Sequence, residues 1–265
     1  HAVAAVAAVS ASIAAHALSL IEVDYEVLPH VIDVDEAMHP DAPLVFADMI
    51  TRGVEPVPTK PSNIAKRLEF STGDLDAGFA SADFIVEKEF TTAAVHQAYI
   101  EPHACVARMD ADGQGEIWCS SQGHFQMRAL TAQILKMPLS NLLVHPAEIG
   151  GGFGGKTVTY LEPVAALLSR KSGAPVRLTM TREETFKASG PTSGASMWVK
   201  MGITKDGKIV AADGIYKFQA GAFPGSPVMN ACLCAYAPYD IANARAVGYD
   251  VVSNRPKAAA YRAPG

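Results

Sequence analysis

Hydrophobic and polar residues along this chain of 265 residues alternate in short runs that are typical of strands and helices in turn. A period of two predicts strands over residues 82–91, 104–109 and 115–121, with a turn at 110–113 between the last two. Apolar residues at helical spacing predict a helix over 126–135, which Pro138 stops. The same patterns then predict a strand at 142–145, a helix at 160–172 ended by Gly173, a strand at 176–181, and a hairpin of 196–204 with 208–218. Strands that pair locally around two or three helices favour an α+β fold over a doubly wound sheet.

The first 62 residues follow a different pattern. Residues 1–21 contain no Asp, Glu, Lys or Arg, so their length alone would allow a membrane span or a signal peptide cleaved near Ala15-His16-Ala17. Because the stretch is mostly alanine and no basic residues precede it, we expect instead a soluble βαβ piece, with strands at 3–9 and 21–25 around a helix at 12–19. Six prolines between residues 28 and 62, without a sustained period, predict a linker or a long wrapping arm.

Composition narrows the class of protein. With 49% apolar and 18% charged residues, the chain is typical of globular proteins and unlike disordered or coiled-coil sequences. Its net charge of −5, without a run of Lys or Arg, leaves little to hold a phosphate backbone, so we expect no nucleic-acid partner. The four cysteines form no CxxC pair for zinc or an iron–sulfur cluster, and Cys232 and Cys234 are expected to be reduced thiols. Since the chain opens on His and ends on Gly in mid-pattern, we also expect a fragment.

The most informative stretch is the glycine-rich segment GGGFGGKT at residues 150–157. It satisfies the P-loop pattern GxxxxGK(S/T) and, through Gly150, Gly152 and Gly155, the dinucleotide-binding pattern GxGxxG. The strand expected before it and the helix expected after it are what both phosphate-binding motifs require. Five glycines in six residues weaken a fold, so a closely approaching ligand or backbone is the usual reason for them.

Residues elsewhere in the chain test these two phosphate-binding alternatives. A P-loop enzyme needs an acidic Mg²⁺ ligand after a second strand, but the best candidate, Asp213, falls within the predicted hairpin. A dinucleotide-binding unit needs an acidic partner for the ribose, and Glu183 stands a little late for that role. Lys156 would clamp a phosphate in a P-loop, whereas otherwise it anchors the loop or lies on the surface. Neither alternative explains the remaining motifs.

Four stretches resemble the molybdenum hydroxylases, the family of xanthine dehydrogenase, aldehyde oxidoreductase and aerobic carbon monoxide dehydrogenase. EIGGGFGGK at 148–156 resembles their glycine loop. IEVDYEVLP, which closes residues 7–29, is similar to the end of their small α/β hammerhead domain. HQAYIEPHACVA at 96–107 resembles the strand that bears a Glu-Pro signature in their first molybdopterin-binding domain, and NRPKAAAYRAPG at 254–265 resembles their second cofactor loop. The motifs stand in the family's order and span nearly the whole chain.

The resemblance implies an organisation and an activity. Residues 1–30 would be the end of the hammerhead domain, 31–66 an extended linker, and 67–265 the first molybdopterin-binding domain, incomplete at its C-terminus. The whole subunit would be a cytoplasmic oxidoreductase that holds molybdenum-molybdopterin, in some members as the cytosine dinucleotide, and inserts a water-derived hydroxyl at an electron-poor carbon. Electrons would leave through 2Fe-2S and FAD groups on partner subunits or domains. The catalytic glutamate would lie beyond residue 265, in the remainder of the subunit, so we expect these residues alone neither to turn over substrate nor to retain molybdenum.

The same resemblance implies which residues bind the cofactor: Gly151, Gly152, Phe153, Gly154, Arg262 and Gln97. Phe153 and Gly154 would face the molybdenum ligands, as would Arg262 through its backbone. Gln97 is the nearest candidate for a glutamine that hydrogen-bonds an apical oxygen, although the strict register puts Val95 there. No side chain is needed to ligate the metal directly.

A neighbouring set of polar residues invites a different interpretation. His96, Glu101 and His103 have the chemistry of metal ligands. We expect instead a strand that buries Tyr99 and provides partners for its polar side chains.

Departures from the family's pattern narrow the substrate. Members that oxidise purines carry Glu, Arg and Phe where this chain has Thr157, Asn230 and Pro264, and copper-bearing carbon monoxide dehydrogenases carry Cys where it has Ala263. A purine and carbon monoxide are therefore disfavoured, which leaves an aldehyde, an N-heteroaromatic compound or an aromatic thioester as the small-molecule substrate. Thr157, Asn230 and Pro264 would border the substrate pocket, with the loop at 221–227 either beside it or a surface turn. A P-loop nucleotide-binding domain using Gly150–Thr157 and a cofactor-free structural relic stay open as alternatives.

Overall fold

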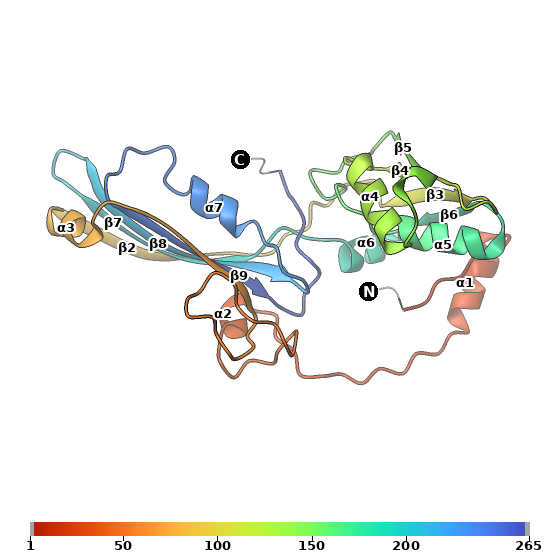
Figure 1. The fold of residues 1–265 in the computed structure, drawn as a ribbon, viewed down its shortest axis with the longest axis horizontal. Coiled ribbons are helices and arrows are strands. Elements are labelled where there is room, and N and C mark those ends of the chain that lie inside the picture. Colours follow the sequence, from red (N-terminus) through yellow and green to blue (C-terminus); the bar gives the residue numbers. More distant parts are fainter. Residues whose placement is uncertain (1–2, 263–265) are drawn as a thin grey trace. The chain divides into compact units, whose positions relative to one another are not determined.

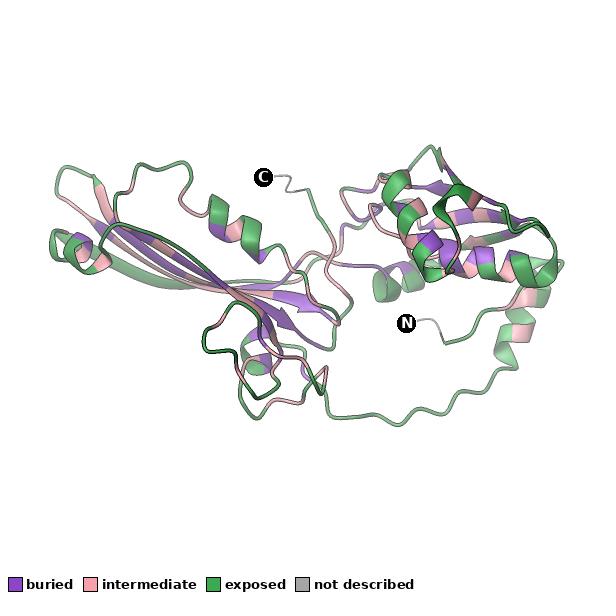
Figure 2. Cartoon of the chain, viewed as in Figure 1, coloured by how far each residue is buried: buried purple, intermediate pink, exposed green. Residues whose placement is uncertain are grey.

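The computed structural model describes residues 3–262, which divide into two compact units. Unit 1 holds the residues up to 27, residues 96–191 and residues 260–262, whereas unit 2 holds residues 28–95 and 192–259 (Figure 1). Each unit contains its own mixed sheet with helices, so the predicted α+β class is confirmed. In both units the buried residues concentrate on the strands and on the helix faces that cover them (Figure 2).

Unit 1 is built on a four-stranded sheet with the order β5-β4-β3-β6. β3 pairs antiparallel with both β4 and β6, while β5 runs parallel to β4 at the edge. The predicted strands here are confirmed within a few residues, and their bounds are β3 Ala104–Met109, β4 Gly115–Ser120, β5 Leu142–Ala147 and β6 Val176–Thr179.

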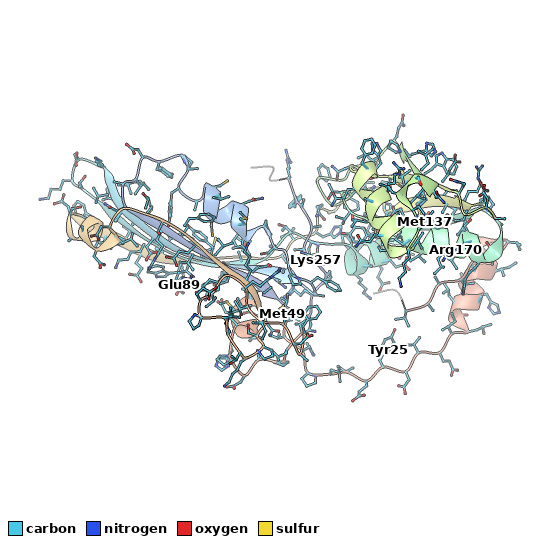
Figure 3. The ribbon with its side chains drawn as sticks, viewed as in Figure 1. Tyr25, Met49, Glu89, Met137, Arg170 and Lys257 are labelled. Carbon is cyan, nitrogen blue, oxygen red and sulfur yellow. The ribbon has the colours of Figure 1, made fainter. Side chains whose placement is uncertain are left out.

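Two helices cover the sheet of unit 1 and form its core. α4 (His124–Ile134) and α5 (Glu162–Ser172) bury Met127, Ala165 and Ala166 against the strands, and the small alanines allow a close approach. Met137, labelled in Figure 3, packs on the same core. Gly173 ends α5 in the left-handed conformation, at φ 66°, as its sequence position predicts. A short 3₁₀ helix, η1 (Leu139–Asn141), and α6 (Arg182–Ala188), which begins with a capping box, complete this part of the chain.

The first residues of unit 1 contain a helix but not the two strands that the sequence predicts beside it. α1 (Ala11–Ser19) begins where Ser10 Oγ accepts the N–H of Ile13. The strands predicted at 3–9 and 21–25 are wrong, because these stretches pair with no other strand among the described residues. Their apolar side chains lie exposed, with Val9 97% and Tyr25 67% accessible. The apolar residues at 3–9 and the alternation at 21–25 therefore occur without the backbone hydrogen-bond ladder that a strand requires. Within residues 3–262, no helix has both the length and the apolar character needed to cross a membrane.

Unit 2 is built on a five-stranded sheet with the order β1-β9-β8-β7-β2. β8 and β9 run parallel, and the other neighbours are antiparallel. The predicted hairpin is confirmed as β7 with β8, joined at Asp206-Gly207, where Gly207 has φ 86°. The strands are β1 Ile64–Thr72, β2 Phe84–Thr92, β7 Ala195–Ile203, β8 Ile209–Gly221 and β9 Ala244–Val252.

Short helices and a long arm cover the sheet of unit 2. α7 (Val228–Cys234) buries Val228 and Cys232 against β1, β8 and β9, and α3 (Leu75–Ala80) packs near β7 and β8. α2 (Val34–Ala37) lies within the arm that the prolines predict, and it packs on Val251. The buried Asn63 ties this arm down, because its amide donates to two arm carbonyls and its oxygen accepts an arm N–H.

Candidate functional site

The glycine-rich segment follows β5 and returns to the end of β4, within unit 1. Three side chains, two from neighbouring segments and one from the loop itself, determine the shape of this loop. The first is Glu101, whose Oε2 accepts both the backbone N–H of Gly150 at 2.8 Å and the ammonium of Lys156 at 2.5 Å. Its own backbone N–H donates to the carbonyl of Gly150 at 3.1 Å. Glu101 therefore fixes both ends of the loop at once.

The second side chain is that of Lys156, which anchors the loop from inside, as one of the sequence alternatives expects. It is fully buried, and its ammonium lies 5.0 Å from the centre of the Tyr99 ring. Burial by itself would raise the pKa of Glu101, but the hydrogen bonds from Lys156 and Gly150 outweigh it and hold that pKa below its ordinary value. The Glu101 carboxylate is therefore ionised at neutral pH.

The third side chain is that of Gln122, at the end of β4. Its Oε1 accepts the N–H groups of Gly154 and Lys156, at 2.9 and 3.2 Å, and its backbone N–H donates to the carbonyl of Lys156 at 2.9 Å. A Cβ on Gly152 would lie only 2.4 Å from this Oε1, so any side chain at position 152 would displace the amide of Gln122 from these contacts.

These contacts leave a row of backbone donors without a protein partner. The N–H groups of Gly151, Gly152 and Phe153 find no acceptor among residues 3–262. Gly151 and Phe153 both have positive φ, 95° and 49°, which is uncommon for a bulky residue such as phenylalanine. The Phe153 side chain is 47% exposed. Successive free N–H groups on such a backbone form a concave anion-binding surface, and a strained residue beside them is typical of functional sites.

A second predicted cofactor segment lies against this loop. The N–H of Arg262 donates to the carbonyl of Phe153 at 2.9 Å, and a Cβ on Gly154 would lie 2.8 Å from the carbonyl oxygen of Ala260. Gln97 holds the same segment, because its Nε2 donates to the carbonyl of Ala260 at 2.7 Å. The Oε1 of Gln97 is buried and without a partner among the described residues. An orphaned buried acceptor of this kind is rare, and it suits a ligand group that donates a hydrogen bond.

The structure brings most of the described site residues together in unit 1 and places one of them in unit 2. Gln97, Arg262, Thr157 and the glycine loop belong to unit 1, where Thr157 Oγ1 donates to the carbonyl of Gly154 at 2.8 Å. Asn230 lies exposed on α7 in unit 2. Pro264 and Ala263 fall outside the described residues. Sequence reasoning missed Gln122, although its place at the end of a predicted strand was a usable signal.

The polar side chains near the Glu-Pro signature are paired, as expected, but with other residues rather than with one another, and the predicted strand is wrong at this point. Tyr99 is buried, and its hydroxyl lies 2.6 Å from His103 Nε2 and 3.1 Å from Ser189 Oγ. His96 reaches the same Ser189 at 2.8 Å. Burial and the nearby Lys156 lower the pKa of His103 to about 4, so this imidazole is neutral at pH 7. β3 begins only at Ala104, so the residues before it form a bent connection.

The same geometry disfavours a P-loop. In a P-loop the lysine and the backbone N–H groups point at phosphates, whereas here Lys156 is fully buried against Glu101, and Gln122 takes two of the loop N–H groups. The following helix begins only at Glu162. Hollows of about 330 and 210 Å³ lie in unit 2, and the glycine loop lines neither of them.

Comparison with known families identifies this part of the chain. The sequence model of the molybdopterin cofactor-binding domain matches residues 57–265. The chain belongs to this family. The match covers the glycine loop, the Glu-Pro signature and the segment at 254–265, so the resemblance to the molybdenum hydroxylases is confirmed.

Individual relatives and structures agree with the family. The chain is 36% identical over 245 residues to a probable hypoxanthine oxidase of Escherichia coli O157:H7, a match that covers 83% of this chain and 26% of that protein. It is 30% identical to the nicotinate dehydrogenase large molybdopterin subunit of Eubacterium barkeri, across 100% of this chain and 60% of that subunit. The aldehyde oxidoreductase from Desulfovibrio gigas superimposes with a TM-score of 0.81 at 26% identity, over 96% of this chain and 27% of that one. The chain thus spans about a quarter of the length of the Escherichia coli relative.

Proposed function

We propose that this chain is the molybdopterin-binding part of a molybdenum hydroxylase, an oxidoreductase that inserts a water-derived hydroxyl at an electron-poor carbon. The observation that carries the proposal is the row of free N–H groups at Gly151, Gly152 and Phe153, beside the unpartnered Oε1 of Gln97. Membership of the cofactor-binding family and the identities of its relatives support the same conclusion.

The residues present fit the cofactor chemically. Molybdopterin offers oxygen acceptors and pterin N–H donors, which match the backbone donors of the loop and the acceptor of Gln97. When bound, the cofactor supplies two-electron exchange with the substrate. The chain would position the cofactor. Phe153 and Gly154, together with the backbone of Arg262, would face the metal's ligands. Glu101 and Lys156 hold the loop on which Phe153 and Gly154 stand.

The rest of the machinery would lie in other parts of the assembly. We place the base that activates water in the remainder of the subunit, and the iron–sulfur and FAD groups on partner subunits or domains, in a cytoplasmic complex. The chain's short span relative to its relatives supports this division. Residues 1–30 as the end of a hammerhead domain, 31–66 as a linker and 67–265 as the cofactor-binding domain belong to the same proposal, as does a cytosine dinucleotide form of the cofactor.

For the substrate we propose an aldehyde, an N-heteroaromatic compound or an aromatic thioester. Thr157, Asn230 and Pro264 stand where purine-oxidising members of the family carry other residues. The name of the Eubacterium barkeri relative indicates an N-heteroaromatic acid, and that of the Desulfovibrio gigas enzyme indicates an aldehyde. The name of the Escherichia coli relative indicates a purine, so hypoxanthine belongs in any substrate panel.

The test is metal and pterin analysis of the full-length protein, purified from its native host with its partner subunits. We expect about one molybdenum per copy and a fluorescent pterin released on denaturation. A protein that contains neither, and that instead releases phosphate from ATP in a magnesium-dependent manner, would overturn the proposal. Turnover is then measured with aldehydes, N-heteroaromatics, an aromatic thioester and hypoxanthine, with an artificial electron acceptor.

A further inference from the structure

Gln122 makes more contacts with the glycine loop than its place in the sequence explains. It immediately precedes α4, whose N-cap is Gly123, and a side chain here could serve the first turn of that helix. It does not: α4 has no side-chain cap, and the N–H of Gly123 is taken by Ser121 Oγ at 3.0 Å. The amide of Gln122 instead crosses to the loop and accepts from Gly154 and Lys156.

The choice of these two N–H groups decides which donors of the loop stay free. Gly150 donates to Glu101, Gly154 and Lys156 donate to Gln122, and Gly155 donates to the carbonyl of Gly152 at 2.7 Å. The N–H groups of Gly151, Gly152 and Phe153 are left between these anchors, without a partner among the described residues. Gln122 therefore accepts two N–H groups of the loop with its own side-chain oxygen. The three N–H groups between the anchors are left for a ligand.

Glycine at position 152 supports this arrangement. The nearest atoms to a Cβ there would be Oε1, Cδ and Cγ of Gln122, at 2.4, 2.6 and 3.1 Å. Because Gly152 has no side chain, there is room for the amide of Gln122. This close approach explains why one position of the motif is glycine. Gly152 and Gln122 therefore depend on each other: the glycine leaves the space, and the amide fills it.

We propose that Gln122 is a positioning residue for the cofactor, because it holds the glycine loop in the form whose free N–H groups face the molybdopterin. The inference rests on the proposed function. Gln122 acts through the backbone of Gly154 and Lys156, and a loop formed before binding has less conformational entropy to lose when the cofactor binds.

The test uses the full-length protein with its partner subunits and three variants. Gln122→Leu removes the acceptor, whereas Gln122→Glu keeps an oxygen in the same place. Gln126→Leu makes the same change at an exposed position of α4, where the glutamine side chain has no hydrogen bond to a described residue, and serves as the matched control. Molybdenum and pterin content, hydrogen exchange of the peptide spanning 149–157 and the thermal unfolding temperature are measured for each.

We expect Gln122→Leu to exchange faster at this peptide and to lose bound cofactor on dialysis roughly tenfold more readily, a typical effect of removing support behind a metal site. Gln122→Glu and Gln126→Leu should keep the loop protection of the wild type. A Gln122→Leu protein with wild-type exchange and cofactor content would overturn the inference, as would a loss shared equally by Gln126→Leu. A wild-type protein without molybdopterin marks a different failure, that of the proposed function itself.

Discussion

The ion pair between Glu101 and Lys156 is asymmetric, and this asymmetry predicts which partner is the more costly to remove. The side chain of Lys156 is fully buried, with 0% exposure, whereas that of Glu101 is 35% exposed. Removing the carboxylate leaves an ammonium that water cannot reach. Removing the ammonium leaves a carboxylate that water solvates. The two single substitutions should therefore differ in their effect on the free energy of unfolding.

The magnitudes follow from the burial of each partner. Breaking a buried pair by removing one partner costs about 3–5 kcal/mol, and Glu101→Gln belongs near the lower limit because its amide oxygen still accepts from Lys156. Lys156→Met loses a charge-assisted hydrogen bond but keeps the packed volume, so about 1–2 kcal/mol is expected. In the double variant no buried charge is left alone, and its loss should be smaller than that of Glu101→Gln.

The two tryptophans of the chain make unit 1 observable by itself. Trp118 lies on β4 in unit 1 and Trp198 on β7 in unit 2. In a Trp198→Phe background, urea unfolding followed by the fluorescence of Trp118 reports the stability of unit 1. A larger loss for Lys156→Met than for Glu101→Gln would refute the reasoning, as would a double variant whose loss equals the sum of the two single losses.

Three further predictions use the same measurement or a simpler one. The pKa of His103 falls from 6.5 to about 4 on burial, so the unfolded chain binds more protons in this window and unit 1 should lose up to about 3 kcal/mol as pH falls from 6.5 to 4. A His103→Gln variant should lose this dependence, and an unchanged pH profile would contradict the assignment. Gly154→Ala should destabilise unit 1 by about 3 kcal/mol and Gly113→Ala by about 1 kcal/mol. Both glycines have positive φ, but only a Cβ on Gly154 would meet a carbonyl oxygen, that of Ala260. Equal losses would contradict that contact. A thiol reagent should label Cys234 alone in the folded chain, since Cys105, Cys119 and Cys232 are buried. Burial also raises the pKa of Cys119 to about 12 and that of Cys232 to about 11. Rapid labelling of a second cysteine would contradict this prediction.

Local patterns predicted the elements of unit 1 better than those of unit 2. β3, β4, α4 and α5 stand in sequence order with clear turns and stops, such as Pro138 and Gly173. β1 and β9 were missed, although β9 lies beside both β1 and β8 in the sheet. Their pairing joins residues such as Leu68 and Gly248, and no local pattern carries that information.

The candidate site shows the same division. The glycine loop and the segment ending at Arg262 were predicted, because their motifs are contiguous in the sequence. The sequence did not predict Gln122, or the contacts of Glu101 with the loop, because both side chains bind a loop that is distant along the chain. The predicted strands at 3–9 and 21–25 failed for the complementary reason: a local pattern was present, but no strand lies beside it.

The nesting of the two units in the sequence has a consequence for synthesis on the ribosome. β2 pairs with β7 from Phe84↔Ile203 to Thr92↔Ala195, and residues 96–191 of unit 1 are made between these two strands. At ordinary translation rates β2 is therefore without its neighbour for on the order of 5 to 20 seconds. During this time the backbone N–H and C=O groups of β2 that β7 later pairs have no partner strand, while unit 1 can already acquire its core. Nascent chains stalled before β7 should bind chaperones through β2, and those extended past β9 should be released.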